Sequence, residues 1–458
     1  MRKIIPTFVV GLWLSMGALA QSPVPFITQP LIPDVVAPGS SSFTLTVHGA
    51  GFLKGAVVEW NRAKLNTRFS DSRTLQATIP ANLVRTSTTG LINVVNAGTK
   101  VRSNSATLPV TTPEAAFRIT GGGELETIDS PVGIATADFD GDGKLDYVST
   151  VDIFSAGETN YAKSVLVAYS SGTGAFRIDK ISLGQRPGGV VAGDFNNDGQ
   201  TDFAVVLEDL GVASVEIFLQ NNGFFHSIGT TPAGILPTNL VAGDFNRDGN
   251  LDLAVEDRDG SSVVILLGTG DGSLTAGQTF PVSTGPVNIT MEDFNGDGIL
   301  DLAIPTQDND VSVALGVGDG TFGTVTNYGA GFAPACATTS DFNGDGIPDL
   351  AVVNASGIGI LLGNGDGSFQ QEKNFPTGQA PTDATSADLD GDGHLDIVVT
   401  TEQGISFLRG NGDGTFQKNV NVDRLLGRGP IVAGDFRIDG RLDLEVNAAG
   451  GAIYTLLQ

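Results

Sequence analysis

The chain has 458 residues and a formal net charge of −26, with 25 basic and 51 acidic side chains. This length suffices for two or three domains with sizeable cores, and so acidic a surface disfavours nucleic acid and anionic membranes as partners. The 62 glycines, with a low aromatic content, are typical of an all-β protein with many tight turns and exclude a disordered or collagen-like chain.

Residues 1–20 are predicted to be a signal peptide. Two basic residues precede an apolar run that ends in the small-residue sequence Ala18-Leu19-Ala20. We therefore expect a secreted protein, extracellular or periplasmic, whose mature form begins near Gln21. The alternative is a single membrane anchor, although the apolar run is short for a bilayer and contains Pro6. No membrane span is expected after removal of the signal peptide.

The next element, residues 24–112, is predicted to be a small β-sandwich. Strand-forming residues occur in four segments, with a turn expected at 49–52, and the segments are 43–47, 56–60, 75–79 and 91–95. The sequence from Pro38-Gly39 to Trp60-Asn61 resembles the IPT/TIG immunoglobulin-like domain. This resemblance implies a spacer or interaction module, and we expect Trp60 to lie in its core.

A nine-residue phrase then occurs seven times, and its copies begin 47 to 56 residues apart. This period is typical of propeller blades. Positions 1, 3, 5 and 9 carry oxygen side chains, position 6 is glycine, and position 7 offers a backbone carbonyl. Such a loop suits a cation with six to eight oxygen ligands, so we predict Ca²⁺; Mg²⁺ demands a tighter octahedron, and Zn²⁺ prefers His or Cys. The alternative is an Asp/Gly turn without metal.

The predicted calcium ligands repeat the same order in each copy. They are Asp138, Asp140, Asp142, Lys144, Asp146; Asp194, Asn196, Asp198, Gln200, Asp202; Asp244, Asn246, Asp248, Asn250, Asp252; Asp293, Asn295, Asp297, Ile299, Asp301; Asp341, Asn343, Asp345, Ile347, Asp349; Asp388, Asp390, Asp392, His394, Asp396; and Asp435, Asp439, Asp443. In copy seven, Arg437 replaces the position-3 ligand. We therefore expect about six Ca²⁺ sites and a seventh that is weak or absent.

Each copy is predicted to belong to a unit of four strands. Position 12 holds strand residues such as Ser149 and Val205, where a helix–loop–helix calcium site needs Glu, so the position-9 Asp closes the loop between two strands. Third strands are expected at 263–267 and 358–362, and an outer strand at 323–328. Between the third and outer strands, Gly-Asp-Gly sequences are interpreted as hairpin turns with glycines at positive φ, the alternative being a second ion site. The position-2 Phe, or Leu389 in copy six, is expected to pack between units.

The last unit lacks an outer strand, because the chain ends with its third strand. Residues 117–120 and 124–128, before the first copy, are similar to the segment that forms the outer strand elsewhere, at 322–329. We therefore predict that the segment before the first copy completes the last unit and removes its open edge.

The copies resemble FG-GAP (VCBS-type) repeats, which build the N-terminal propeller of integrin α subunits. The resemblance covers residues 115–458 and implies an all-β fold, a seven-bladed β-propeller preceded by the immunoglobulin-like sandwich, with calcium in its loops. It does not single out a function, because the family includes adhesion proteins, lectin-like modules and parts of extracellular enzymes.

Sequence motifs favour a binding protein over an enzyme. The three histidines, His48, His226 and His394, stand in no catalytic motif, and 23 of the 51 acids belong to the seven loops. We predict an adhesion or ligand-binding module for a glycan or protein. The alternative is a glycosidase or polysaccharide lyase with paired carboxylates on the propeller face.

If the face is used as in integrins, the partner docks opposite the calcium loops. The longest insertion on that side, 152–163, is interpreted as ordinary loop variation or as a binding loop. The single cysteine, Cys336, excludes an intrachain disulfide, so something else must stabilise this exported chain.

Overall fold

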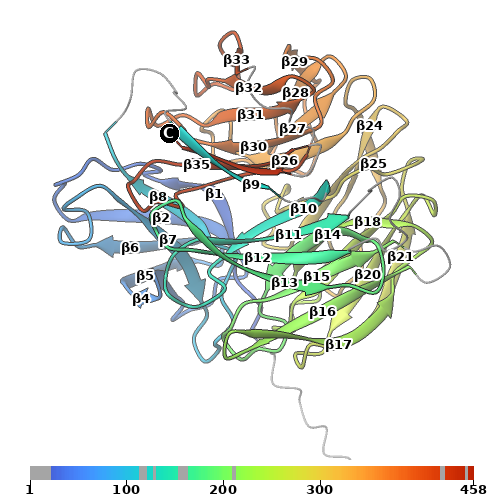
Figure 1. The fold of residues 1–458 in the computed structure, drawn as a ribbon, viewed down its shortest axis with the longest axis horizontal. Coiled ribbons are helices and arrows are strands. Elements are labelled where there is room, and N and C mark those ends of the chain that lie inside the picture. The colour runs from blue at the N-terminus through green and yellow to red at the C-terminus, as the bar shows by residue number, and fades with distance from the viewer. Residues whose placement is uncertain are drawn as a thin grey trace, which may run out of the picture.

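The computed structural model describes residues 22–112, 121–126, 130–152, 163–208, 213–422, 429–448 and 452–457. Within these ranges the chain is all-β and forms nine four-stranded antiparallel sheets, shown in Figure 1. None of the described segments is a helix with the length and apolar character of a membrane span. The predicted signal peptide and most of the predicted insertion at 152–163 lie outside the described residues.

Two sheets form an N-terminal unit, residues 22–112. The first has the order β1-β2-β6-β5 and the second β4-β3-β7-β8. Their strands are β1 (Phe26–Ile32), β2 (Phe43–Ala50), β3 (Val57–Trp60), β4 (Ala63–Lys64), β5 (Asn66–Asp71), β6 (Thr74–Ile79), β7 (Thr88–Val95) and β8 (Ala106–Val110). Apolar side chains of both sheets, such as Leu45 and Ile92, share one core, and Trp60 is buried in it as expected.

One predicted turn in this unit begins later than expected. Strand β2 continues through Gly49 and Ala50, where the sequence indicated a turn at 49–52. A Cβ atom on residue 49 would lie 1.9 Å from the carbonyl oxygen of Phe26 in β1, so only glycine allows the two strands to pair there. The glycine marks a close backbone approach within the sheet.

The other seven sheets, here called the ring, follow one plan in which consecutive strands pair. Their strands, sheet by sheet, are β10 (Ser130–Ala137), β11 (Asp146–Asp152), β12 (Ser164–Ser170), β13 (Phe176–Ser182); β14 (Pro187–Gly193), β15 (Asp202–Leu207), β16 (Ser214–Asn221), β17 (Phe224–Pro232); β18 (Pro237–Gly243), β19 (Asp252–Asp257), β20 (Ser262–Gly268), β21 (Leu274–Pro281); β22 (Thr290–Glu292), β23 (Asp301–Pro305), β24 (Asp310–Ala314), β25 (Thr326–Gly329); β26 (Cys336–Ser340), β27 (Asp349–Asn354), β28 (Gly357–Leu361), β29 (Lys373–Phe375); β30 (Asp383–Ala387), β31 (Asp396–Thr401), β32 (Gly404–Leu408), β33 (Val420–Val422); and β34 (Ile431–Gly434), β35 (Asp443–Ala448), β36 (Ala452–Leu457), β9 (Gly121–Glu126). In each sheet the nine-residue loop joins the first strand to the second, and the position-9 Asp begins the second strand.

The last sheet is completed by a strand from before the first repeat, as the sequence predicted. Strand β9 pairs antiparallel with β36, from Ala452 opposite Glu126 to Leu457 opposite Gly121. Of the two segments proposed for this strand, 117–120 lies outside the described residues, and the second begins three residues earlier than expected. The chain therefore ties its C-terminal sheet to a segment more than 300 residues away in sequence.

Seven apolar clusters join neighbouring sheets of the ring within the described residues. Each contains one position-2 side chain, in ring order Phe139, Phe195, Phe245, Phe294, Phe342, Leu389 and Phe436. The last of these clusters joins the seventh sheet to the first, with Tyr147 beside Phe436. This confirms that the position-2 residue packs between units, and a circular array of four-stranded sheets fits a β-propeller.

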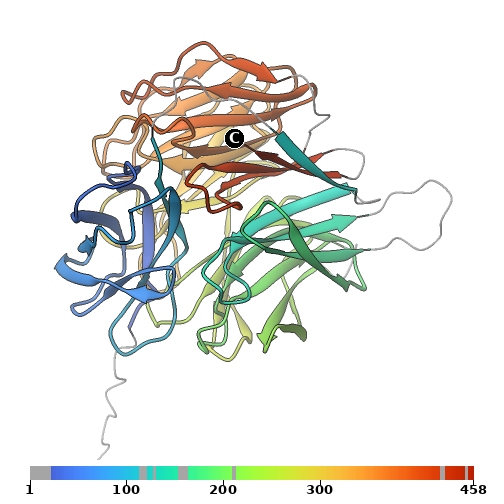
Figure 2. The ribbon, with the colours of Figure 1, turned by 60° about the vertical axis from the view of Figure 1, so that its left-hand side comes forward.

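The N-terminal unit lies against the side of the ring that carries the nine-residue loops, here called the loop face; Figure 2 shows it in blue beside the ring. Apolar side chains join the two parts: Val24 and Val101 belong to the cluster between the second and third sheets, and Leu91 to that between the seventh and first. The contact is thus apolar as well as polar.

Candidate metal-binding loops

The nine-residue loops share one network of side-chain to backbone hydrogen bonds. In loop four, Asp293 accepts bonds from the backbone N–H groups of Asp297 (3.0 Å) and Gly298 (2.8 Å), and Asn295 accepts another from Asp297 (2.9 Å). Asp297 in turn accepts one from Ile299 (2.8 Å). Gly298 at position 6 has a φ of 83°, where a side chain would be strained. The short polar side chains therefore fold the loop around themselves.

In two loops, three of the side chains predicted as calcium ligands lie close together. Carboxylate oxygens of positions 1, 3 and 5 lie within 4.8 Å of one another in loop one and in loop six, in residues Asp138, Asp140 and Asp142 and in residues Asp388, Asp390 and Asp392. Burial and the neighbouring Asp142 raise the pKa of Asp140. An oxygen-only donor set of this kind could hold a hard cation such as Ca²⁺.

The position-9 aspartate has a structural role that the sequence analysis missed. Asp301 is fully buried, and its two oxygens accept backbone N–H bonds from Phe294 in the loop (2.9 Å) and Gly316 after the third strand (2.8 Å). Burial raises its pKa to about 7. The same pair of bonds recurs at Asp146, Asp202, Asp252, Asp349 and Asp396. This side chain braces each loop against its sheet, and neither carboxylate triad includes it.

Loop seven contains a cation of its own. Arg437 at position 3 pairs with Asp443 (2.7 Å) and Asp439 (3.2 Å), the position-9 and position-5 carboxylates. A metal ion would have to compete with this guanidinium for the same oxygens. The arrangement agrees with the expectation of a weak or absent seventh site, which stays a prediction together with the number of sites and the position-7 carbonyl ligands.

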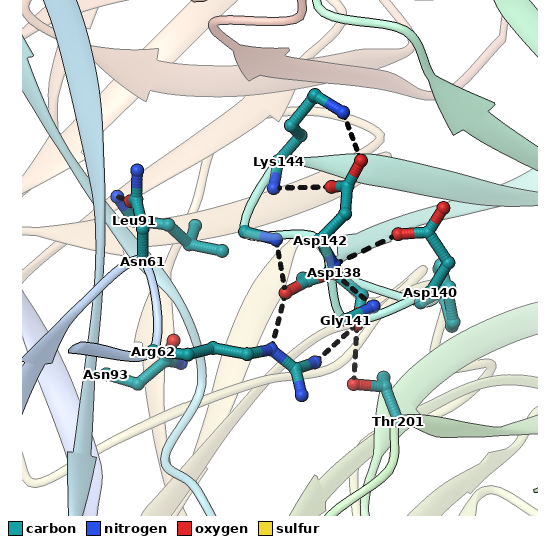
Figure 3. Close-up of polar contacts among 12 residues, drawn as sticks. Asn61, Arg62, Leu91, Asn93, Asp138, Asp140, Gly141, Asp142, Lys144 and Thr201 are labelled. Carbon is teal, nitrogen blue, oxygen red and sulfur yellow. Dashed lines mark hydrogen bonds and ion pairs between the residues drawn. The ribbon is translucent and has the colours of Figure 1, made fainter.

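Two further arginines, which do not belong to the nine-residue loops, form ion pairs with carboxylates at predicted ligand positions. Arg409, directly after β32, pairs with Asp390 (2.6 Å) and Asp392 (2.9 Å) in loop six. Arg62, in the N-terminal unit, donates from Nε to Oδ2 of Asp138 in loop one (2.6 Å), as Figure 3 shows. No local sequence pattern links residues 62 and 138, so sequence analysis had no signal for this contact.

Other donors of the N-terminal unit, two neutral and one charged, reach further loops. The backbone N–H of Val24 donates to Asp244 (2.8 Å) and the hydroxyl of Thr89 to Asp435 (2.6 Å), both at position 1. Arg102 donates to the carbonyl of Gly199 in loop two (3.0 Å). The N-terminal unit is therefore bonded to loops one, two, three and seven, and covers that part of the loop face.

At the opposite end of the ring, the seven sheets surround a central cavity of about 330 Å³. Every sheet contributes to its wall, and the polar groups include Asn239, Asn288 and Asp383. Oδ2 of Asp383 accepts the backbone N–H of Ile431 (2.9 Å), and burial raises the pKa of this carboxyl. Burial and the adjacent Asp383 raise the pKa of the Cys336 thiol, so this buried cysteine is a poor nucleophile.

Residues 341–399 and 388–446 match the FG-GAP-like repeat family. A comparison with curated proteins gave no match. Among solved structures, BBS1N in complex with ARL6DN has a TM-score of 0.50 at 12% identity, covering 75% of this chain and 97% of that chain. An Agrocybe aegerita lectin that recognises non-reducing terminal N-acetylglucosamine has a TM-score of 0.46 at 19% identity, covering 80% and 96%. A rhamnogalacturonan lyase from Bacillus licheniformis has a TM-score of 0.46 at 14% identity, covering 96% and 90%. Likeness at such identities concerns the fold alone.

Proposed function

We propose that the chain is a secreted, calcium-binding β-propeller of seven blades that recognises a glycan or protein through the face opposite its loops. The ring of seven sheets and the FG-GAP-like repeats support the propeller, and the carboxylate triads support calcium. The proposal assigns 24–112 to an IPT/TIG-like sandwich and 115–458 to the propeller. Secretion rests on the apolar segment at 1–20.

The position of the N-terminal unit supports the assignment of the ligand to the face opposite the loops. Its bonds to Asp138, Asp244 and Asp435 occupy much of the loop face with the chain's own residues. The opposite face contains the central cavity, whose volume of about 330 Å³ is in the range of small-ligand sites. An external ligand is therefore expected at that face.

The rim of this face carries exposed apolar side chains on fixed loops. Ile235 is 60% exposed and Phe332 is 73% exposed, and they lie in the loops before the third and fifth inner strands. Backbone bonds from Arg258 to Leu236 (3.0 Å) and from Ala355 to Phe332 (2.8 Å) hold these loops against the neighbouring hairpins. Exposed apolar groups on ordered loops around a polar cavity are typical of recognition surfaces.

An array experiment with the calcium-loaded mature protein tests this proposal. Glycans and extracellular-matrix proteins are printed, and wild type is compared with Phe332→Ala, Asp383→Asn and Phe224→Ala. Phe224 is 79% exposed but lies at the start of outer strand β17, so it is a matched control. We expect specific binding that falls at least about tenfold in the first two variants and stays unchanged in the third. No binding, or equal loss in all variants, contradicts the proposed face, and polysaccharide turnover supports the enzyme alternative instead.

A further inference from the structure

The loops differ in charge, and external arginines accompany the difference. Loops two to five have Asn at position 3, whereas loops one and six have a fourth carboxylate there, Asp140 or Asp390. Among loops one to six of the described structure, these two form an ion pair between a ligand carboxylate and an arginine outside the loop. The arginine is Arg62 at loop one and Arg409 at loop six. One guanidinium from outside the loop thus accompanies each additional carboxylate, and in loop one the loop's own Lys144 also pairs with Asp142.

We propose that Arg62 lowers the calcium affinity of loop one and thereby links metal binding there to docking of the N-terminal unit. The inference rests on the proposed calcium function, and it assigns a role to a residue outside the repeat. Arg409 performs the corresponding charge compensation in loop six from within the ring. Its ion pairs in the described structure are with Asp390 and Asp392, not with the N-terminal unit.

Arg62 is held in place by its own unit. Asn61 and Arg62 form the two-residue turn between β3 and β4, both at positive φ (46° and 64°), and the Asn61 side chain accepts the backbone N–H of Leu91 (2.6 Å). From this turn the guanidinium reaches Oδ2 of Asp138 and, at 3.2 Å, its carbonyl oxygen (Figure 3). The loop therefore receives a charge fixed by a separate folded unit.

The shared carboxylate determines the sign of the coupling. Asp138 is only 5% exposed and Arg62 26%, so solvent screens their interaction less than that of a surface pair. Oδ2 of Asp138 also accepts the N–H of Gly143 (3.1 Å). A calcium ion on Asp138 would be repelled by the guanidinium on the same carboxylate. Because coupling free energies are reciprocal, calcium at loop one weakens the Arg62 contact as much as Arg62 weakens calcium binding.

The other contacts keep the N-terminal unit docked when this pair is lost. Val24 and Thr89 bond the position-1 carboxylates of loops three and seven with neutral donors, and apolar residues join the two cores. Removal of the Arg62 charge is therefore expected to change loop one without separating the unit from the ring.

Calcium titration calorimetry of the full mature protein tests the charge role. We expect Arg62→Gln to raise the affinity of one site about tenfold, the order expected for removal of one nearby cation. Arg62→Lys retains the charge and should resemble wild type, as should Arg68→Gln, which removes an exposed charge from β5 of the same unit. Asp140→Asn should weaken the site, and the double variant Arg62→Gln/Asp140→Asn should return towards wild type.

Hydrogen exchange of the turn at residues 61–62 tests the link to docking. Calcium should accelerate exchange there in wild type and leave it unchanged in Arg62→Gln. If wild type binds calcium but Arg62→Gln leaves every affinity within about twofold, or lowers one, the role of Arg62 is wrong while the calcium function stands. If wild type binds no calcium, the proposed metal function itself is wrong, and this inference with it.

Discussion

Three buried glutamates outside the ligand positions show how individual acids are tolerated in this fold. Glu256, Glu292 and Glu445 lie in strands β19, β22 and β35, and burial raises their pKa values to about 7, 8 and 8. Hydroxyl groups of Thr238 and Thr28 bond the first two. Because the neutral form is favoured inside the protein, such residues make stability depend on pH.

Glu256 is the cleanest of the three to test. Its pKa rises from 4.5 to about 7 on folding, so the folded state keeps a proton that the unfolded chain loses between these values. Its contribution is full below pH 4.5 and is lost as the pH rises through 7, by about 3 kcal/mol at 1.4 kcal/mol per pH unit. The neutral Gln does not titrate, so the free energy of unfolding of Glu256→Gln should increase relative to that of wild type, by this amount, as the pH rises from 4.5 to 8. Urea unfolding at several pH values measures the difference. The control Asp271→Asn, at an exposed turn, should run parallel to wild type above pH 5, and a parallel line for Glu256→Gln would contradict the assignment.

Arg437 gives a second prediction at the scale of one residue. In chelator, Arg437→Asn should lower Tm, because buried Asp443 loses its cation. In saturating calcium the order should reverse, because Asn restores a position-3 oxygen and a seventh site. The reciprocal variant Asn295→Arg should abolish one site in loop four. Melting curves of wild type and Arg437→Asn in chelator and in calcium test this reversal. The same order of Tm values in both buffers would contradict the assignment of Arg437 as the residue that replaces the metal.

Among the elements, the repeated loops were predictable from sequence because their information is local. The Asp, Asn and Gly side chains of a nine-residue phrase bond the backbone of the same phrase, as at Asp293 and Gly298. The Gly-Asp-Gly hairpins likewise have positive φ, for instance 77° at Gly270 and 89° at Gly272. The brace formed by the position-9 aspartate was missed, because its second partner, such as Gly316 after the third strand, lies outside the nine-residue phrase.

Closure of the ring by β9 leads to a prediction for this element. Replacing residues 115–128 by a Gly/Ser linker of equal length should leave β36 without its partner, lower Tm by several degrees and favour aggregation. A Gly/Ser replacement of β33, an outer strand that follows the other strands of its sheet in sequence, should lower Tm less because the ring stays closed. Hydrogen exchange should show β35 and β36 opening first in the former variant. Equal melting of the two variants would indicate that closure contributes nothing beyond an ordinary outer strand.

At the scale of the whole molecule, acidic side chains are concentrated on the loop face of the ring. Of 51 acids, 23 lie in the seven loops, and the N-terminal unit covers part of this face with donors from Arg62, Val24 and Thr89. The sequence predicted the loops and the sheets of each part but not their docking, because the contacts join single residues more than 70 positions apart and follow no period. With Cys336 as the only cysteine, no intrachain disulfide can compensate for the repulsion.

Calcium should counteract this repulsion between the loop carboxylates. Calcium that binds the folded loops and hardly the unfolded chain stabilises by RT ln(1 + [L]/Kd), about 2.7 kcal/mol per site at a hundredfold excess over Kd. Several sites should therefore raise Tm by many degrees over that in chelator, and Asp297→Ala should lower the calcium-loaded value by removing one ligand of loop four. Sodium chloride at matched ionic strength separates screening from specific binding, since screening alone would give sodium and calcium the same effect. If Tm is indifferent to chelator, the loops contribute no metal-dependent stability, and the carboxylates must be kept apart by hydrogen bonds and arginines alone.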